Sequence, residues 1–252
     1  MIVGRHALVT GGGSGVGKAI ALALAEAGID VTICGRRLTA LAAVASLHDR
    51  IHAVVADVTD EASMTRLYET AEAERGPLDI VVANAGMAGS APASKTALAD
   101  WQKTIDVNLT GAFLTVKPAL AGTTARKGGR IIFIASTAGL KGYAYVAPYV
   151  AAKHGVVGLM RALAVEAAKS GVTVNAICPS FVETDMLEES ISRIVGKTGR
   201  SEAEARASLM ASNPQGRFVQ PEEIAASVLF LCSAAAASIT GQSISVSGGE
   251  TW

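Results

Sequence analysis

The chain has 252 residues, of which 50% are hydrophobic and 17% are charged. This balance is typical of a folded protein with a large core and excludes general disorder. The 22 Lys and Arg residues equal the 22 Asp and Glu residues in number, so no basic excess is present to attract a nucleic acid or an anionic membrane.

Short β-branched runs alternate with longer runs rich in Ala and Leu along the whole chain. In chain order, the predicted elements are a strand at 7–10, a helix at 16–27, a strand at 31–34, a helix at 38–47, a strand at 51–56, a helix at 61–75, a strand at 78–83, a helix from about 98 towards Pro118, a strand at 130–135, a helix at 148–170, a strand at 172–178, a helix at 221–231 and a strand at 243–246. Continuous apolar strands that alternate with helices predict a doubly wound parallel α/β sheet with both faces covered.

No Pro- or Ser-rich linker divides the chain, so a single domain over residues 1–252 is expected. Only residues 184–220 interrupt the alternation of strands and helices, with a charged segment that favours helix. This segment follows a strand end, which is where doubly wound sheets bind ligands. It is therefore either a lid over a substrate site or a pair of solvated amphipathic helices.

The cysteines and the hydropathy of the chain bear on its location. Cys34, Cys178 and Cys232 are far apart and form no CxxC pair, so neither a disulfide framework nor a metal site is expected. No stretch approaches the roughly 18 uncharged apolar residues that span a bilayer, and the first residues lack the profile of a signal peptide. The sequence predicts a cytoplasmic protein without a membrane partner.

A glycine-rich turn joins the first predicted strand to the first predicted helix. Gly11, Gly15 and Gly17 are spaced as GxxxGxG, which is neither the GxGxxG pattern nor a phosphate loop of the Walker type. Glycines at such a turn allow backbone N–H groups to approach a phosphate, and the start of the helix adds a positive dipole. The turn predicts a dinucleotide site, and an ordinary flexible turn is the alternative.

The end of the second predicted strand bears on the choice of dinucleotide. An acidic residue at this place would bind a ribose 2′-hydroxyl and repel a 2′-phosphate. The sequence has Arg36 and Arg37 instead, and arginine forms charge-assisted hydrogen bonds to phosphate. NADP(H) is therefore favoured over NAD(H), unless the two arginines only solvate the start of a helix.

Tyr149 and Lys153 lie four residues apart at the start of a helix that Pro148 begins, so both side chains share one helix face. An ammonium beside a phenol favours the phenolate, and we expect Lys153 to lower the pKa of Tyr149 towards neutrality. Tyr149 is then a candidate general acid and base for a carbonyl or alcohol oxygen. Ser136, at the end of the preceding strand, is either a hydrogen-bond donor to that oxygen or a turn and capping residue.

Taken together, these residues resemble the short-chain dehydrogenase/reductase family. The likeness covers nearly the whole chain, and it rests on the following motifs: Thr10-Gly11-x-x-x-Gly15-x-Gly17, Asn84-Ala85-Gly86, Asn108, Ser136 and Tyr149-x-x-x-Lys153. It implies a seven-stranded Rossmann-type sheet and an enzyme that transfers hydride between a nicotinamide cofactor and a carbonyl or alcohol.

The resemblance also implies a role for each residue of the site. Tyr149 would be the acid and base, and Ser136 would hold the substrate oxygen. Lys153 would bind the nicotinamide ribose, while Asn108 would hold a water in a proton relay through Lys153. With the residues above, the expected cofactor-binding set is Gly11, Ser14, Gly15, Val16, Gly17, Arg36, Arg37, Asp57, Val58, Asn84, Ala85, Gly86, Tyr149, Lys153, Pro179, Val182 and Thr184.

Two positions depart from the family pattern. Ala83 stands where the family usually has the first Asn of Asn-Asn-Ala-Gly, and Ser180 stands where it usually has the glycine of Pro-Gly. A side chain at 180 would narrow the nicotinamide pocket or reorient Phe181. The resemblance therefore supports a cofactor-binding role for Val182 and Thr184 less strongly. Neither departure affects the expected acid and base residues.

Within the family, the segments around Tyr149 and Pro179 resemble bacterial β-ketoacyl and polyketide ketoreductases. That likeness implies a 3-oxoacyl thioester of acyl carrier protein or coenzyme A as substrate. A secondary-alcohol, polyol or hydroxysteroid dehydrogenase is the alternative, and a non-catalytic NADP(H)-binding regulator is a remote one. The end of the chain resembles that of tetrameric members, which implies a homotetramer.

Several side chains around the predicted site suit an acyl or ring substrate. The apolar or aromatic ones are Leu140, Tyr143, Tyr145, Phe181, Met186 and Leu187, unless they only close the core or an oligomer contact. The cations of the 184–220 segment that could meet a phosphate of the carrier are Arg193, Lys197 and Arg200, although a solvated helix face is the commoner role for such residues.

Overall fold

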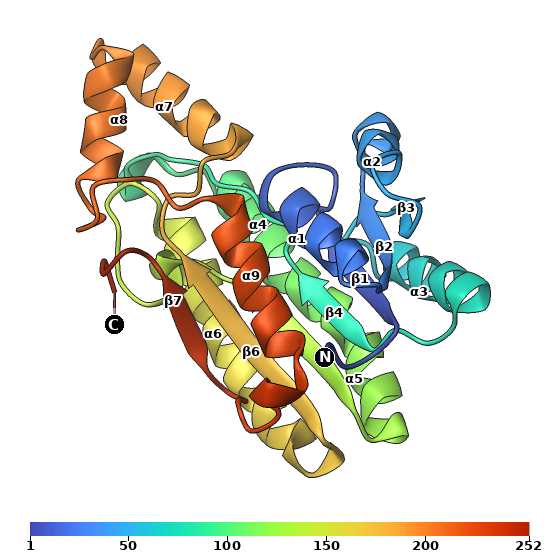
Figure 1. Ribbon diagram of the computed structural model, residues 1–252. Helices are drawn as coiled ribbons and strands as arrows, with labels where there is room; N and C mark the ends of the chain where they lie inside the picture. Colours follow the sequence, from blue (N-terminus) through green and yellow to red (C-terminus); the bar gives the residue numbers. More distant parts are fainter. Residues whose placement is uncertain (252) are drawn as a thin grey trace.

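The computed structural model of the protein describes residues 1–251, which contain one sheet of seven parallel strands (Figure 1). The strands are β1 (His6–Thr10), β2 (Asp30–Gly35), β3 (Ile51–Val55), β4 (Ile80–Ala83), β5 (Gly129–Ile134), β6 (Val172–Pro179) and β7 (Ser243–Val246). Their order is β3-β2-β1-β4-β5-β6-β7, and every neighbouring pair is parallel. The predicted doubly wound sheet is confirmed.

The helices connect these strands and flank the sheet. They are α1 (Gly15–Glu26), α2 (Leu38–Ala45), α3 (Glu61–Arg75), α4 (Leu98–Ile105), α5 (Gly111–Arg126), α6 (Ala147–Ala167), α7 (Asp185–Thr198), α8 (Glu202–Met210) and α9 (Pro221–Cys232). A π-helical segment, Asp106–Thr110, joins α4 to α5. Short 3₁₀ turns occupy Ala93–Lys95, Thr137–Gly139, Ala168–Ser170 and Ala234–Ala236.

The helix predicted from about 98 towards Pro118 differs from the one observed. α5 continues through Pro118 to Arg126, although proline removes one backbone hydrogen bond of the helix at a cost of about 3 kcal/mol. The buried face of α5 runs from Val116 before the proline to Ala119 and Thr123 beyond it, and all three residues are buried. Burial of that face offsets the lost bond and carries the helix past Pro118.

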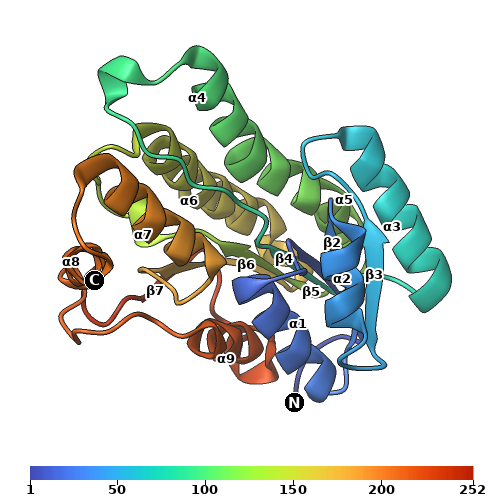
Figure 2. The ribbon, with the colours of Figure 1, turned by 90° about the horizontal axis from the view of Figure 1, so that it is seen from above.

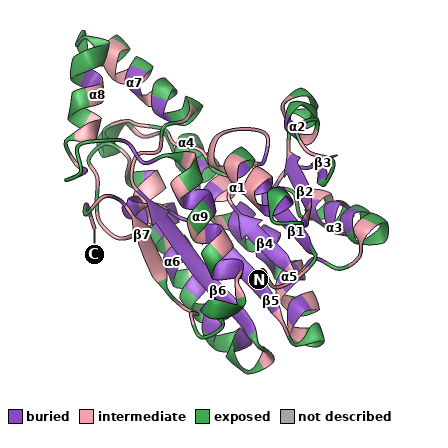
Figure 3. Ribbon diagram, in the orientation of Figure 1, coloured by how far each residue is buried: buried purple, intermediate pink, exposed green. Residues whose placement is uncertain are grey.

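Helices cover both faces of the sheet. The apolar residues of α1, α2 and α9 pack in one core with those of β1 and β2, and the residues of α3, α5 and α6 pack in a second core on the opposite face. Seen from above, α5 and α6 lie on one side of the strands and α1 and α9 on the other (Figure 2). The central strands β1, β4, β5 and β6 are buried along their whole length, as parallel strands covered on both faces must be, whereas the edge strands β3 and β7 are mostly only partly buried (Figure 3).

The strand order reverses between β1 and β4, so the connections that leave these two strands turn to opposite sides. In doubly wound sheets such a reversal opens a crevice at the carboxyl ends of the strands. Beyond that edge, α7 and α8 stand apart from the sheet and share a small core of their own, which contains Leu187, Ile191, Ala205 and Phe218 (Figure 1).

The hydropathy of the helices and the state of the cysteines complete the description of the fold. No helix among residues 1–251 is long and apolar enough to cross a membrane. The three cysteines are buried, and each is a free thiol.

Candidate active site

A pocket of about 880 Å³ lies at the carboxyl ends of β1, β2, β4, β5 and β6, and is called the central pocket below. The structure brings all of the predicted catalytic and cofactor-binding residues into its lining: Gly11, Ser14, Gly15, Val16, Gly17, Arg36, Arg37, Asp57, Val58, Asn84, Ala85, Gly86, Asn108, Ser136, Tyr149, Lys153, Pro179, Val182 and Thr184. These predicted residues span 173 positions of the sequence, from Gly11 to Thr184, and all of them face one cavity.

The glycine-rich turn forms one end of the central pocket. Gly11 and Gly15 have φ values of +67° and +50°, which glycine adopts most readily. A Cβ on Gly17 would overlap the carbonyl oxygen of Gly11, so no larger residue fits this close approach. α1 begins at Gly15 without a side-chain cap and without an acidic residue in its first turn. Its free N–H groups and positive dipole are those of an anion site, and they fit the pyrophosphate of a dinucleotide.

Thr10 joins the ends of β1 and β4 beside this turn. Its Oγ1 accepts hydrogen bonds from the backbone N–H groups of Asn84 and Ala85, both at 3.0 Å. In return, the Asn84 amide donates to the carbonyl of Thr10 at 2.8 Å. Thr10 is 1% exposed and holds the two loops on either side of the crevice together. The sequence shows it only as the first residue of the turn motif, because its partners lie more than 70 positions away.

The two arginines at the end of β2 lie at the rim of the central pocket with exposed side chains. Asp57 lies on the same rim, and its pKa is lowered mainly by a hydrogen bond from the backbone N–H of Thr59, with a smaller contribution from Arg36. The rim therefore offers two guanidinium groups to a phosphate and one ionised carboxylate to hydrogen-bond donors.

Lys153 is buried on the inner face of α6, with 4% of its surface exposed. Its Nζ donates a hydrogen bond of 2.9 Å to the carbonyl of Ile134, at the end of β5. Burial lowers the pKa of the Lys153 amine to about 8, because the charged form loses its hydration. At neutral pH the amine is still mostly protonated.

Tyr149 lies one helical turn before Lys153, and its ring centre is 5.5 Å from Nζ. The expectation that Lys153 lowers the pKa of Tyr149 is wrong, because the pKa shifts in the opposite direction. Burial raises the pKa of the Tyr149 phenol above its ordinary value of 10, and the Ser136 hydroxyl only partly offsets this. Because the pKa of Lys153 is about 8 and that of the phenol is raised, the amine is mostly neutral at the pH where the phenol would lose its proton. Lys153 therefore gives the phenolate little electrostatic stabilisation. Tyr149 therefore holds its proton at neutral pH.

Ser136 ends the strand region beside Tyr149 and has two hydrogen-bonding contacts. Its Oγ accepts from the backbone N–H of Ala138 at 3.1 Å and lies 3.5 Å from the carbonyl oxygen of Pro179. Ser136 thus caps the Thr137–Gly139 turn, which was the structural alternative, and the same hydroxyl lines the central pocket. The two interpretations are compatible.

Asn108 reaches the central pocket from the π-helical segment, a local distortion that is frequent at functional sites. Its amide donates to the carbonyls of Met87 and Thr104, both at 2.9 Å, and its Oδ1 accepts from the backbone N–H of Met87 at 3.3 Å. The amide is fixed in orientation, and Oδ1 keeps one lone pair. A Cβ on Gly86 would lie 2.9 Å from this Oδ1 and 3.8 Å from Nζ of Lys153, so Gly86 separates the two groups.

Most of the other expected pocket residues are also in place. Tyr143, Tyr145, Phe181, Met186, Leu187 and Arg193 line the central pocket. Leu140 is absent from its lining and packs against the core instead. Lys197 and Arg200 are absent from the lining as well, and the Lys197 Nζ donates to the carbonyl of Ser90 at 2.8 Å.

The comparisons with known proteins agree with this geometry. A sequence model of the short chain dehydrogenase family matches residues 5–194. The chain belongs to that family. A Streptomyces violaceoruber protein assigned as ketoacyl reductase 1 of the granaticin polyketide synthase is 43% identical over 250 residues, which cover 96% of this chain and 92% of the relative. A 3-oxoacyl-[acyl-carrier-protein] reductase of Synechocystis is 39% identical, with 98% and 97% covered.

The family membership extends to solved structures. A variant of the actinorhodin polyketide ketoreductase with NADPH superimposes with a TM-score of 0.94 at 37% identity, covering 98% of this chain and 97% of that one. A seven-stranded Rossmann-type dehydrogenase fold and an oxidoreductase of this family are therefore established for the chain.

The two glycines of the loop after β4 provide a matched pair of substitutions. Gly86→Ala puts a methyl group 2.9 Å from Oδ1 of Asn108, whereas Gly89→Ala adds its methyl group in open space on the same loop. We expect Gly86→Ala to displace the Asn108 amide and to lower kcat at least tenfold, with Gly89→Ala within twofold of wild type. Steady-state kinetics on both variants, with thermal unfolding as the check on folding, measure this. Equal kcat in the two variants would contradict the assigned geometry.

Proposed function

We propose that the protein reduces the ketone of a 3-oxoacyl thioester to a secondary alcohol with NADPH, and catalyses the reverse reaction as well. One observation carries the proposal: the Tyr149 phenol and the Lys153 amine face the same pocket as the glycine-rich turn. Two groups that exchange protons thus lie in a cavity that also fits a dinucleotide.

The residues that would hold the cofactor follow the pocket from one end to the other. The turn at Gly11–Gly17 and the N-terminus of α1 receive the pyrophosphate. Asp57 and Val58 would contact the adenine, and Val182 and Thr184 the carboxamide; all four line the pocket. Thr184 also lies beside the glycine-rich turn, since its Cγ2 would be 3.1 Å from a Cβ on Gly15. When bound, NADPH supplies the hydride for the carbonyl carbon.

The chain supplies the proton for the carbonyl oxygen. Because burial keeps the pKa of the Tyr149 phenol high, this group is protonated at neutral pH and is ready to donate. Tyr149 would donate its phenolic proton to the ketone oxygen, which completes the O–H bond of the alcohol, and the phenol would be left as a phenolate. The Ser136 hydroxyl donates a hydrogen bond to the oxygen as its negative charge grows.

Lys153 returns the proton to Tyr149. With a pKa of about 8, its ammonium is mostly charged at neutral pH yet releases a proton readily. Asn108, whose Oδ1 keeps a free lone pair beside Gly86, holds a water that carries protons from solvent to Lys153. In the reverse reaction each proton moves in the opposite direction.

The substrate end of the central pocket suits an acyl chain. Phe181, Met186 and Leu187 line it, and α7 with α8 covers residues 185–210 of the expected lid. We assign residues 184–220 as the lid over the acyl group. The Arg193 guanidinium on the lid lines the pocket and suits a phosphate of the carrier arm. The relatives named as ketoacyl and 3-oxoacyl reductases support this substrate class.

The proposal extends to the assembly and location of the protein. Phe113 of α5, Val165 of α6 and Phe230 of α9 are apolar side chains with 41%, 79% and 50% of their surface exposed. These side chains are available for contacts between subunits of the homotetramer that the C-terminal resemblance implies. Three free thiols support a reducing compartment such as the cytoplasm.

Tyr149→Phe tests the proton donor. Removing the phenolic oxygen should lower kcat for a 3-oxoacyl thioester by 10²–10⁴-fold, the usual range for a lost general acid, while NADPH still binds. NADPH consumption measured by absorbance gives the rate. Tyr145→Phe is the matched control, because the Tyr145 ring lines the same pocket and is 66% exposed. Turnover by Tyr149→Phe at the wild-type rate would contradict the mechanism. If the wild-type protein converts other ketones or alcohols but no 3-oxoacyl thioester, the proposed substrate class is wrong.

Arg36→Ala and Arg37→Ala test the choice of cofactor. A lost charge-assisted bond to the 2′-phosphate costs about 1.5–3 kcal/mol, so the Kd for NADPH should rise about tenfold or more while the Kd for NADH stays within threefold. Fluorescence titration of both cofactors measures this. Arg50→Ala is the control, because Arg50 pairs with Asp30 outside the pocket lining. An equal loss of affinity for NADH would show that the arginines do not select the phosphate.

A further inference from the structure

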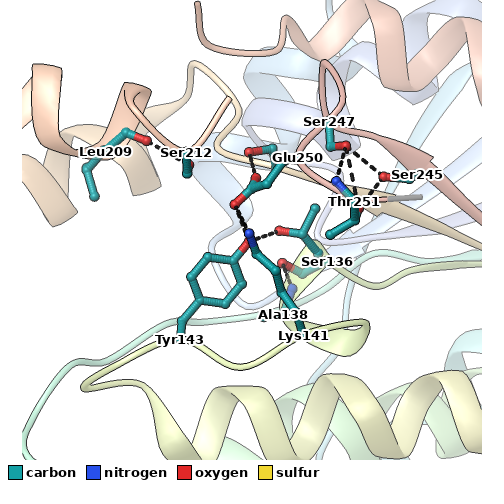
Figure 4. A network of polar contacts seen from close by, with 12 residues as sticks. Ser136, Ala138, Lys141, Tyr143, Leu209, Ser212, Ser245, Ser247, Glu250 and Thr251 are labelled. Carbon is teal, nitrogen blue, oxygen red and sulfur yellow. Dashed lines mark hydrogen bonds and ion pairs between the residues drawn. The ribbon is translucent and has the colours of Figure 1, made fainter. Parts of the chain in front are cut away.

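The carboxylate of Glu250 lies in a network of polar contacts with Tyr143 and Lys141 (Figure 4). The side chain of Glu250, near the C-terminus, is 1% exposed. One of its oxygens accepts a hydrogen bond of 2.5 Å from the Tyr143 hydroxyl and pairs with the Lys141 ammonium at 3.0 Å. The other oxygen accepts a hydrogen bond from the Ser180 hydroxyl. The mechanism proposed above uses none of these contacts.

This group of residues borders the catalytic serine on two sides. On one side, the Tyr143 hydroxyl is 2.6 Å from Oγ1 of Thr137, the residue after Ser136. On the other side, Ser180 follows Pro179, whose carbonyl oxygen is 3.5 Å from Oγ of Ser136. Tyr143, Thr137 and Ser180 all line the central pocket. They therefore surround the place where the carbonyl group and its next substituent would lie.

Thr137, Tyr143 and Ser180 together are called the hydroxyl wall, or simply the wall, of the central pocket below. The directions of their hydrogen bonds decide what this wall can bind. A hydroxyl group carries one proton and two lone pairs. Tyr143 and Ser180 both spend their proton on Glu250, so the Thr137 hydroxyl must donate to the Tyr143 oxygen. None of the three hydroxyl groups has a proton left for the pocket. The wall can accept hydrogen bonds from a substrate but cannot donate any.

The wall also carries negative charge. Burial raises the pKa of Glu250, but the hydrogen bonds from Ser180, Tyr143 and Lys141 together outweigh it and leave the pKa below its ordinary value. The carboxylate is therefore ionised at neutral pH. The Lys141 ammonium partly neutralises the Glu250 charge, but Lys141 does not line the pocket, and 40% of its side chain is exposed to solvent. A second carboxylate in the pocket would lose its hydration and find neither a donor hydroxyl nor a free cation at this wall.

We propose that Glu250 determines specificity: it keeps the wall free of hydrogen-bond donors, and the site thereby rejects 3-oxo acids with a free carboxylate and accepts neutral esters and thioesters of the same acids. The inference rests on the ketone reduction proposed above and adds the substrate class. It also gives a function to Ser180, which replaces the usual glycine of the family and supplies one of the hydroxyl groups bound to Glu250.

The test uses two ketones that differ in charge and by one methyl group, 3-oxobutanoate and its methyl ester, with NADPH. We expect the wild-type kcat/KM to favour the ester by at least 100-fold. In Glu250→Gln, the amide removes the charge and donates one hydrogen bond of its own, which frees a hydroxyl proton of Tyr143 or Ser180 for the pocket. The preference for the ester should fall at least tenfold in this variant, and the ratio of the two constants is the readout, whatever the absolute rate.

Lys141→Met is the opposing variant, and it keeps the inference testable if Glu250→Gln does not fold. It removes only a partly exposed ammonium, leaves Glu250 uncompensated and should raise the preference for the ester at least threefold. Glu69→Gln, on the exposed surface of α3, is the control and should leave the ratio unchanged.

The outcomes separate the inference from the function beneath it. Reduction of the ester by the wild type, with the same ester preference in Glu250→Gln and Lys141→Met, would overturn the role of Glu250 and leave the proposed function in place. A wild-type preference for the acid would overturn it too. Reduction of neither ketone, nor of a longer 3-oxoacyl thioester, would contradict the proposed function, and the inference would fall with it.

Discussion

The Lys153 ammonium lies in the protein interior between the end of β5 and the ring of Tyr149, with its Nζ 2.9 Å from the Ile134 carbonyl. Removing a cation from water is costly, and the cost brings its pKa down to about 8. The same loss of water raises the pKa of the Tyr149 phenol. Burial thus favours a neutral Tyr149 phenol next to a charged Lys153 amine that can release a proton. That state suits reduction of a ketone, in which the site must give a proton.

The remaining parts of the central pocket act around this pair. The glycine turn and the first turn of α1 supply backbone donors for an anion at one end. At the other end, Glu250 takes the protons of Tyr143 and Ser180, so these two hydroxyl groups can only accept hydrogen bonds from the pocket. A single cavity therefore offers donors to the phosphates of a cofactor and acceptors to the neutral end of a substrate.

The local features of the fold and site could be predicted from the sequence, and the long-range ones could not. The apolar runs predicted all seven strands, and the Tyr149-x-x-x-Lys153 spacing predicted a shared helix face, because both depend on neighbours within a few residues. The continuation of α5 through Pro118 depends on packing against the sheet, which overrides a local breaker. The pKa of Tyr149 was predicted with the wrong sign, because spacing indicates the nearby amine but not the burial of both groups. The contact of Glu250 with Tyr143 joins residues 107 positions apart, and no local pattern announces it.

The order in which the two groups lose their protons tests the account most directly. Tyrosine labelled with ¹³C at Cζ reports each phenol by NMR, and the spectrum of Tyr149→Phe assigns the signal of Tyr149. Labelled lysine, with Lys153→Met as its reference, reports the amine in the same titration of the cofactor-free protein. The account predicts that Lys153 titrates near pH 8 while the Tyr149 phenol keeps its proton beyond pH 10. A Tyr149 phenolate that forms below pH 8, beside a Lys153 that is still charged, would contradict it.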